Sequence, residues 1–175
     1  HGFDYFFGVP YSNDMNPFAL YRMSQNIEKP VTQATLTKRY TDEALKFIES
    51  NKDDPFFAYI HYNMPHVPLF VSDDFSGKSD AGLYGDAVEE MDANIGRIID
   101  TVDNLGLTKN TLIIFTSDNG PWWEGSSGNF RDRKGSSFDG GLRVPFIARL
   151  KGLLPEGQVC EGLAMNTDIH PTIAA

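Results

Sequence analysis

Apolar residues recur along the chain with the period of a helix in two places. The first predicted helix carries its apolar face at Leu36, Tyr40, Ala44, Phe47 and Ile48. The second places its apolar face at Val88, Met91, Ile95, Ile98, Val102 and Leu105. Gly106 suits the position just after the end of that helix. We interpret its other acidic residues as a solvated face: Glu89, Glu90, Asp92, Asp100 and Asp103.

Near-continuous apolar runs predict strands between and after these helices. The runs are Phe56 to Tyr62 and Thr111 to Ser117, and a further apolar stretch covers residues 142–150. Alternation of helix and strand predicts an α/β fold with a mostly parallel sheet and helices on both faces. We expect residues 1–175 to belong to a single domain.

Asp118 and Asn119 follow directly after the run that ends at Ser117. In open α/β sheets, ligands bind beyond the carboxyl ends of the strands. A carboxylate and an amide oxygen are hard donors that suit Ca²⁺ or Mg²⁺. The alternative is that Asp-Asn-Gly is only a turn that closes the strand.

Two further loops carry candidate chemistry. His66 stands between Pro65 and Pro68, just past the first apolar run, and Lys134 stands in the loop before the run 142–150. A metal pair, a histidine and a lysine brought together by these loops would suit an oxyanion substrate. The long connection 120–141 also carries Trp122 and Trp123. They either stack on a sugar or aryl ring or pack on the domain surface, and both readings stay open.

Composition excludes two classes of partner. The formal net charge of -9 argues against a nucleic-acid partner and leaves no basic face for an anionic membrane. No apolar run approaches the roughly 20 residues that span a bilayer. We therefore expect neither a nucleic-acid nor a membrane partner.

Several motifs, in a common order, resemble one enzyme family. They are Ser-Asp-Asn-Gly at 117–120, Pro-His-Val-Pro at 65–68 and Gly-Ser-Ser-Phe-Asp-Gly-Gly-Leu-Arg-Val-Pro at 135–145, with residues 1–14 and 84–92. Together they resemble the sulfatases of the arylsulfatase A and N-acetylgalactosamine-6-sulfatase type. The resemblance runs along the whole chain. It implies an alkaline phosphatase-like α/β domain that hydrolyses sulfate esters of aryl or sugar compounds.

The resemblance also implies roles for individual residues. Asp118 and Asn119 match metal ligands, with Ca²⁺ expected and Mg²⁺ as the alternative. His66 and Lys134 match a sulfate-contacting histidine and lysine, and Ser12 matches a serine beside the sulfate. The implied partner is a sulfated small molecule or glycan, and a divalent cation with two cationic side chains would offset charge as the S–O bond breaks.

Three family features have no match in this sequence. These are a Cys-x-Pro-Ser-Arg motif whose cysteine becomes formylglycine, an aspartate pair of the metal site and a Lys-x-His-Leu-Gly segment. Cys160 lacks the proline and arginine, and we interpret it as a half-buried apolar residue. We expect the middle-to-late part of a sulfatase catalytic domain, truncated at both ends and partnered by the N-terminal remainder of its own domain. The isolated chain is expected to be inactive.

Two alternatives remain. A phosphodiesterase or phosphonate hydrolase of the alkaline phosphatase superfamily would share the fold, but its two-metal site usually has a histidine after the aspartate. Asn119 argues against that arrangement. The other alternative is a non-catalytic fragment that binds an anion or a sugar. The family suggests a periplasmic or extracellular location, which the sequence does not itself assign.

Overall fold

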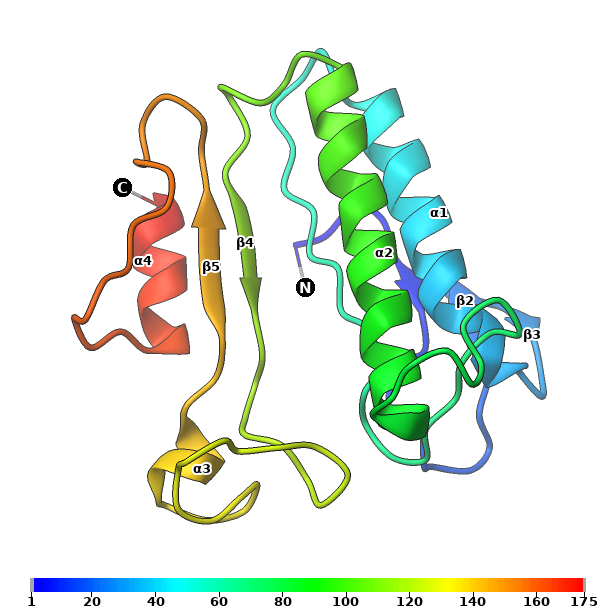
Figure 1. Ribbon diagram of the computed structural model, residues 1–175. Helices are drawn as coiled ribbons and strands as arrows, with labels where there is room; N and C mark the ends of the chain where they lie inside the picture. Colours follow the sequence, from blue (N-terminus) through cyan, green and yellow to red (C-terminus); the bar gives the residue numbers. More distant parts are fainter. Residues whose placement is uncertain (1, 175) are drawn as a thin grey trace. The chain divides into compact units, whose positions relative to one another are not determined.

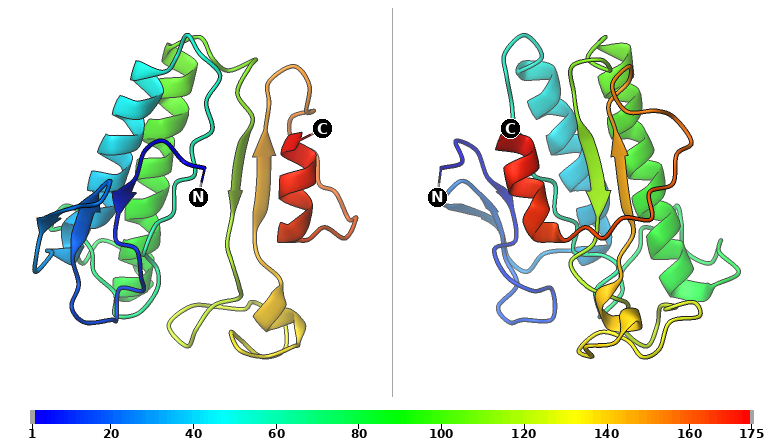
Figure 2. Two further views of the ribbon diagram at one scale, coloured as in Figure 1. Left: turned by 180° about the vertical axis from the view of Figure 1, so that it is seen from behind. Right: turned by 90° about the vertical axis from the view of Figure 1, so that its left-hand side faces the viewer.

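A computed structural model describes residues 2–174 of the chain. It divides the chain into two compact units, His1–Leu107 and Thr108–Ala175, and each is described by itself. The elements of each unit can be followed in Figure 1 and in the further views of Figure 2. The expectation of a single domain stays a prediction.

Both predicted helices are confirmed in the first unit. A 3-10 turn, η1 (Gln33–Thr35), leads into α1 (Leu36–Ser50), and α2 (Gly82–Asn104) lies beside α1. The end of α2 is also as predicted: Gly106 has φ +74°, and the Leu107 N–H donates to the Val102 carbonyl at 3.0 Å. This is the Schellman arrangement that glycine favours.

A small antiparallel sheet packs against the start of α1. Its strands are β1 (Phe7–Gly8), β2 (Leu20–Arg22) and β3 (Gln25–Glu28), in that spatial order. Phe18, Leu20, Leu36 and Tyr40 form a buried cluster there. The sequence just after Ser12 is thereby attached to α1 through apolar burial.

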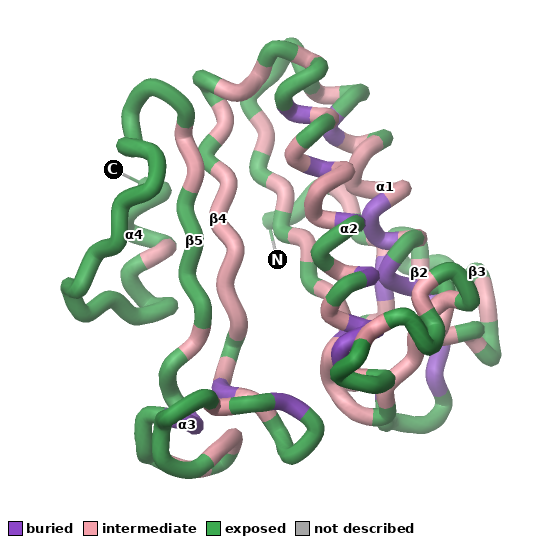
Figure 3. The backbone as a smooth tube through the Cα atoms, viewed as in Figure 1, coloured by how far each residue is buried: buried purple, intermediate pink, exposed green. Residues whose placement is uncertain are grey.

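The second unit is built on a two-stranded antiparallel sheet. β4 (Ile113–Thr116) pairs with β5 (Phe146–Arg149), with Ile113 opposite Arg149. A short helix, α3 (Asp139–Leu142), precedes β5, while η2 (Asn166–Asp168) and α4 (Ile169–Ala174) follow it. Figure 3 shows buried residues along α1 and α2, whereas most of β5 and the following segment is exposed.

Two expectations about strands differ from the structure. Residues 56–62 are not assigned as a strand, because among the described residues no neighbouring strand supplies the hydrogen-bond ladder that defines one. Both sheets formed by residues 2–174 are antiparallel, so the parallel pairing expected from the alternation is not observed in them.

Cys160 is exposed, so the interpretation of a half-buried residue was wrong. Every residue from Lys151 to Asp168 is exposed, so this thiol lies in a segment without buried residues. Of the helices within residues 2–174, none has the length and apolar character needed to cross a membrane.

Candidate active site

The loop around His66 is attached to α1. The His66 N–H donates to the Asn63 carbonyl at 3.0 Å, and the Tyr40 hydroxyl donates to Asn63 Oδ1 at 2.6 Å. Burial raises the pKa of Tyr40 to about 12, so this hydroxyl stays a donor well above neutral pH. Next to it, the hydroxyls of Thr41 and Tyr62 are 2.8 Å apart. The α1 helix therefore fixes the residues that lead into the His66 loop.

Asn13 connects the Ser12 segment to His66. Asn13 is 3% exposed, and its Oδ1 lies 2.9 Å from His66 Nδ1. Its Nδ2 donates to the Pro68 carbonyl at 2.9 Å and to Gln33 Oε1 at 3.2 Å. In return, Gln33 Nε2 donates to the Asn13 carbonyl at 2.9 Å. The structure thus places Ser12, as the neighbour of Asn13, close to the His66 loop.

Sequence reasoning missed Asn13 and Gln33. Asn13 lies in the Pro-Tyr-Ser-Asn-Asp stretch that supported the resemblance, directly after the selected Ser12. A polar residue in such a stretch reads as a surface residue, since nothing local indicates that it is buried. Only the packing of residues far apart in the sequence shows its partners.

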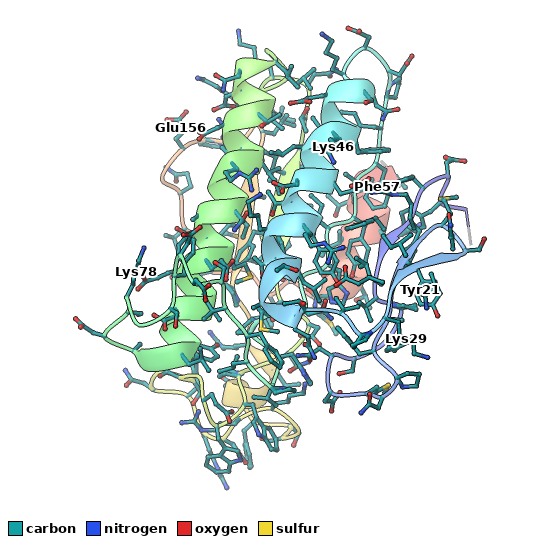
Figure 4. The ribbon with its side chains drawn as sticks, turned by 90° about the vertical axis from the view of Figure 1, so that its right-hand side faces the viewer. Tyr21, Lys29, Lys46, Phe57, Lys78 and Glu156 are labelled. Carbon is teal, nitrogen blue, oxygen red and sulfur yellow. The ribbon has the colours of Figure 1, made fainter. Side chains whose placement is uncertain are left out.

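Two carboxylates near the start of α2 bind the chain that follows His66. Asp86 accepts hydrogen bonds from the backbone N–H groups of Ser79, Gly77 and Lys78, at 2.7, 2.8 and 3.0 Å. These bonds hold the pKa of Asp86 below its usual value, and the bond from Ser79 contributes most. Figure 4 shows Lys78 on the loop beside the start of α2.

Glu90 is the second of these carboxylates, and its expected place on a solvated face was wrong. It is 2% exposed and accepts a hydrogen bond from the Ser72 N–H at 3.0 Å. Its acidic neighbours Glu89 and Asp92 are exposed, as predicted. Glu90 differs because the loop after His66 folds over this turn of α2. The Ser72 N–H in that loop needs an acceptor, and Glu90 supplies it.

In the second unit, Asp118 and Asn119 lie together at the end of β4. Asn119 Nδ2 donates to Asp118 Oδ2 at 2.5 Å, and the Asp118 side chain is exposed. Behind them, Asn166 Nδ2 donates to the Ser117 carbonyl at 3.0 Å. The start of η2 therefore holds the backbone from which the pair projects.

Glycines bring the Lys134 loop against this strand end. The Gly120 N–H donates to the Gly141 carbonyl at 2.9 Å, and the Lys134 N–H donates to the Pro121 carbonyl at 3.0 Å. A Cβ at Gly120 would stand 2.0 Å from the Gly140 oxygen, so only glycine permits this approach. The structure thus brings Lys134 to the same corner as Asp118 and Asn119.

Trp122 and Trp123 are exposed on the next turn. Their side chains meet edge to face with ring centroids 6.4 Å apart, and they are 46% and 70% exposed. Arg133 donates to the carbonyls of Trp122 and Gly125 and lies 5.3 Å from the Trp123 ring centroid. One guanidinium therefore orders the turn and one indole face, while much of both rings faces solvent.

The donor chemistry at the end of β4 fits a hard divalent cation in part. Asp118 and Asn119 offer oxygen donors from adjacent residues, which is the set that Ca²⁺ or Mg²⁺ prefers. Within residues 2–174, no group of three or more His, Cys, Asp or Glu side chains is placed to hold a metal ion. These two residues would supply only a part of the coordination shell.

Comparison with known proteins assigns the family. The sulfatase family model matches residues 1–175. The chain is 40% identical to human steryl-sulfatase, over 94% of this chain and 30% of that protein. It is 39% identical to mouse N-acetylgalactosamine-6-sulfatase, over 98% of this chain and 38% of that protein. The chain belongs to the sulfatase family.

Solved structures also resemble this chain. The PsFucS1 sulfatase from Pseudoalteromonas sp. is 31% identical with a TM-score of 0.78, covering 89% of this chain and 34% of that one. Ps i-CgsB in complex with k-i-k-neocarrahexaose is 28% identical with a TM-score of 0.80, covering 89% and 36%. These neighbours support the α/β class. The chain spans about a third of the length of the curated relatives it matches.

Proposed function

We propose that this chain forms part of a sulfuric ester hydrolase, which uses water to convert a sulfate ester into an alcohol and inorganic sulfate. One observation carries the proposal in this sulfatase-family chain. Backbone hydrogen bonds from Lys134 to Pro121 and from Gly120 to Gly141 bring a lysine to the corner that presents Asp118 and Asn119. A lysine whose backbone is bonded to the segment just after two hard oxygen donors is suited to a sulfate oxyanion.

Asp118 and Asn119 are proposed to hold the metal, which we propose to be Ca²⁺, with Mg²⁺ as the alternative. Once bound, the cation supplies Lewis-acid polarisation of a sulfate oxygen. The Lys134 ammonium is proposed to bind the sulfate and to offset charge that develops in the transition state. The family's formylglycine finds no fitting residue here, because the exposed Cys160 stands in Val-Cys-Glu, so no step is assigned to it.

For His66 and Ser12, both in the first unit, we propose roles toward a sulfate ester. Protonated His66 binds a sulfate or bridging oxygen and gives its proton to the departing alcohol. Ser12, beside the buried Asn13, offers a hydroxyl to the sulfate. Their placement together in the first unit supports a shared role.

A sulfated glycan or aryl sulfate is the proposed substrate. The exposed rings of Trp122 and Trp123 can stack on a sugar or aryl face. A structure that resembles this chain holds k-i-k-neocarrahexaose, which supports a glycan. We further propose that the rest of a longer sulfatase domain completes the metal site, supplies the nucleophile and extends the sheet with parallel strands.

The test is hydrolysis by the full-length sulfatase in which these residues stand. A chromogenic aryl sulfate and a sulfated oligosaccharide are assayed with the parent protein, Lys134→Ala and the matched control Lys109→Ala, an exposed lysine of the same unit. Loss of one preorganised electrostatic partner lowers turnover by about 10²- to 10³-fold. Lys109→Ala should retain parental turnover, and circular dichroism checks folding.

The same assay separates the alternatives. Parental turnover by Lys134→Ala would remove Lys134 from the site. Hydrolysis of a phosphodiester or phosphonate ester in preference to the sulfate ester would favour the phosphodiesterase class. Binding of the sulfated glycan without turnover would favour a non-catalytic role.

A further inference from the structure

The amide of Asn13 can be oriented from its partners alone. Its Nδ2 lies 2.9 Å from the carbonyl oxygen of Pro68 and 3.4 Å from that of His66, and both are acceptors only. The third partner is Gln33 Oε1 at 3.2 Å, since Gln33 Nε2 already donates to the Asn13 carbonyl. Nitrogen must face these three acceptors, so Oδ1 must face His66.

This orientation decides which ring nitrogen of His66 carries the proton. Asn13 Oδ1 can only accept, and it lies 2.9 Å from His66 Nδ1. Neutral His66 is therefore the Nδ1–H tautomer, with the lone pair on Nε2. With Nδ1 bonded to Asn13, Nε2 is the ring nitrogen that can contact a substrate.

We propose that Asn13 is a positioning residue that fixes the tautomer and ring orientation of His66 and leaves Nε2 for the substrate. This rests on the proposed function, in which His66 contacts the sulfate ester. Imidazolium His66 gives its Nε2 proton to the alcohol oxygen as the S–O bond breaks, and it returns to the Nδ1–H form. A neutral imidazole in water favours the Nε2–H tautomer, in which Nε2 is a donor. After His66 has given its proton to the alcohol, Nε2 is instead an acceptor.

Asn13 suits this role because its own position is fixed. It is 3% exposed, and Gln33 binds both its side chain and its backbone carbonyl from the turn before α1. The contact to Pro68 comes from the same loop as His66, so one amide binds both the ring and the loop. A partner held in this way orients a ligand or catalytic imidazole, as hydrogen-bonded neighbours do at metal sites.

The direct test is the nitrogen-15 NMR spectrum of the histidine rings in the chain, at a pH where the imidazoles are neutral. The chain has four histidines, and His66→Gln assigns the signal of interest. We expect a protonated Nδ1 and an unprotonated Nε2 at His66. An Nε2–H signal for His66 in the unsubstituted chain would overturn the proposal.

Two substitutions sharpen the test. Asn13→Leu removes the acceptor at similar size and should move His66 toward Nε2–H, whereas Asn13→Asp keeps an acceptor for Nδ1 and should retain Nδ1–H. The exposed His61, stacked on Tyr59, is an internal control whose signals should not change. An unchanged His66 tautomer in folded Asn13→Leu would contradict the role of Asn13.

Kinetics in the full-length sulfatase separate this inference from the proposed function. We expect Asn13→Leu to lower kcat by about 10- to 100-fold with a smaller effect on KM, and Asn13→Asp to recover part of it. Equal loss in both variants, or none in Asn13→Leu, would overturn positioning by Asn13. Full turnover by His66→Gln would instead overturn the role of His66, and with it the use of Nε2, while His61→Gln serves as the control.

Discussion

The backbone N–H of Lys134 donates a hydrogen bond to the carbonyl oxygen of Pro121 at 3.0 Å. Pro121 follows Gly120, whose own N–H donates to the Gly141 carbonyl at 2.9 Å. Backbone segments this close together leave no space for a side chain at Gly120. The contact of the Lys134 loop with the segment after Asp118 and Asn119 therefore depends on a glycine, which has no side-chain chemistry of its own.

Gly120→Ala is accordingly expected to separate the Lys134 loop from the end of β4. The new Cβ would meet the Gly140 oxygen at 2.0 Å, and backbone must move to relieve it. Overpacking of this kind costs about 1 to 3 kcal/mol. Urea unfolding measures the loss, and backbone amide shifts of Lys134 and Gly141 show where it occurs.

Gly96→Ala is the matched control. A Cβ at Gly96 meets nothing within 4 Å, and the residue lies inside α2. Alanine is favoured over glycine in a helix by about 0.5 to 1 kcal/mol, so this variant should be slightly more stable. Equal stability of the two alanine variants would show that the close approach at Gly120 is not tight.

The Asp86 carboxylate makes the stability of the first unit depend on pH. Its folded pKa lies below the ordinary value of 3.8, chiefly through the hydrogen bond from Ser79. A group with a depressed folded pKa contributes fully above its unfolded pKa, and the contribution disappears as pH falls through the folded value. We expect Asp86→Asn to be less stable than the parent at neutral pH, with the difference shrinking below about pH 4.

Urea midpoints measured across this range check the Asp86 prediction. Asp92→Asn is the control, since Asp92 is exposed on the same helix. A difference between parent and Asp86→Asn that stayed constant down to about pH 2 would contradict the assigned cause.

Glu90 and Glu89 form a natural pair for a comparison. Glu90 is 2% exposed and accepts a hydrogen bond from Ser72, whereas Glu89 is exposed. Glu90→Ala removes the charged acceptor of the half-buried Ser72 N–H, and a hydrogen bond to a charged group contributes about 1.5 to 3 kcal/mol. Glu89→Ala should change stability by less than about 0.5 kcal/mol. Thermal unfolding of both variants decides, and similar losses would mean that burial of Glu90 does not matter.

Arg133→Ala should free the turn that carries the two tryptophans. The guanidinium donates to the Trp122 carbonyl at 3.1 Å and lies over the Trp123 ring. Trp122 and Trp123 are the only tryptophans in the chain, so fluorescence excited selectively in tryptophan reports on this turn alone. We expect stronger acrylamide quenching and a changed emission maximum in Arg133→Ala. Arg131→Ala, whose guanidinium lies over Phe138, should leave the spectrum unchanged.

Calcium is expected to bind the isolated chain weakly. Asp118 and Asn119 supply few of the about six to eight oxygens that Ca²⁺ takes, and the weakest protein sites for Ca²⁺ have Kd values of about 10⁻⁴ to 10⁻³ M. Isothermal calorimetry of the chain and of Asp118→Ala measures this. Micromolar or tighter binding that Asp118→Ala abolished would mean that further ligands of this chain complete the site.

The local sequence pattern was sufficient to predict the two helices and to identify the candidate site residues. The apolar stripes of α1 and α2 follow from a period that each residue shares with near neighbours, and Gly106 ends α2 because of its own backbone freedom. The strand before Asp118 was visible for the same reason. The motifs that include His66, Asp118 and Lys134 identified the family without any knowledge of their contacts.

Pairing and burial were decided only by the tertiary structure. Strand status at 56–62 depends on a partner strand, and the direction of β4 and β5 depends on which strand lies alongside. Glu90 and Glu89 are the same residue type on the same helix, yet only the first is covered by a distant loop. Asn13 likewise reaches His66 across 53 positions of sequence. Such contacts depend on how remote segments pack, and no local period in the sequence records them.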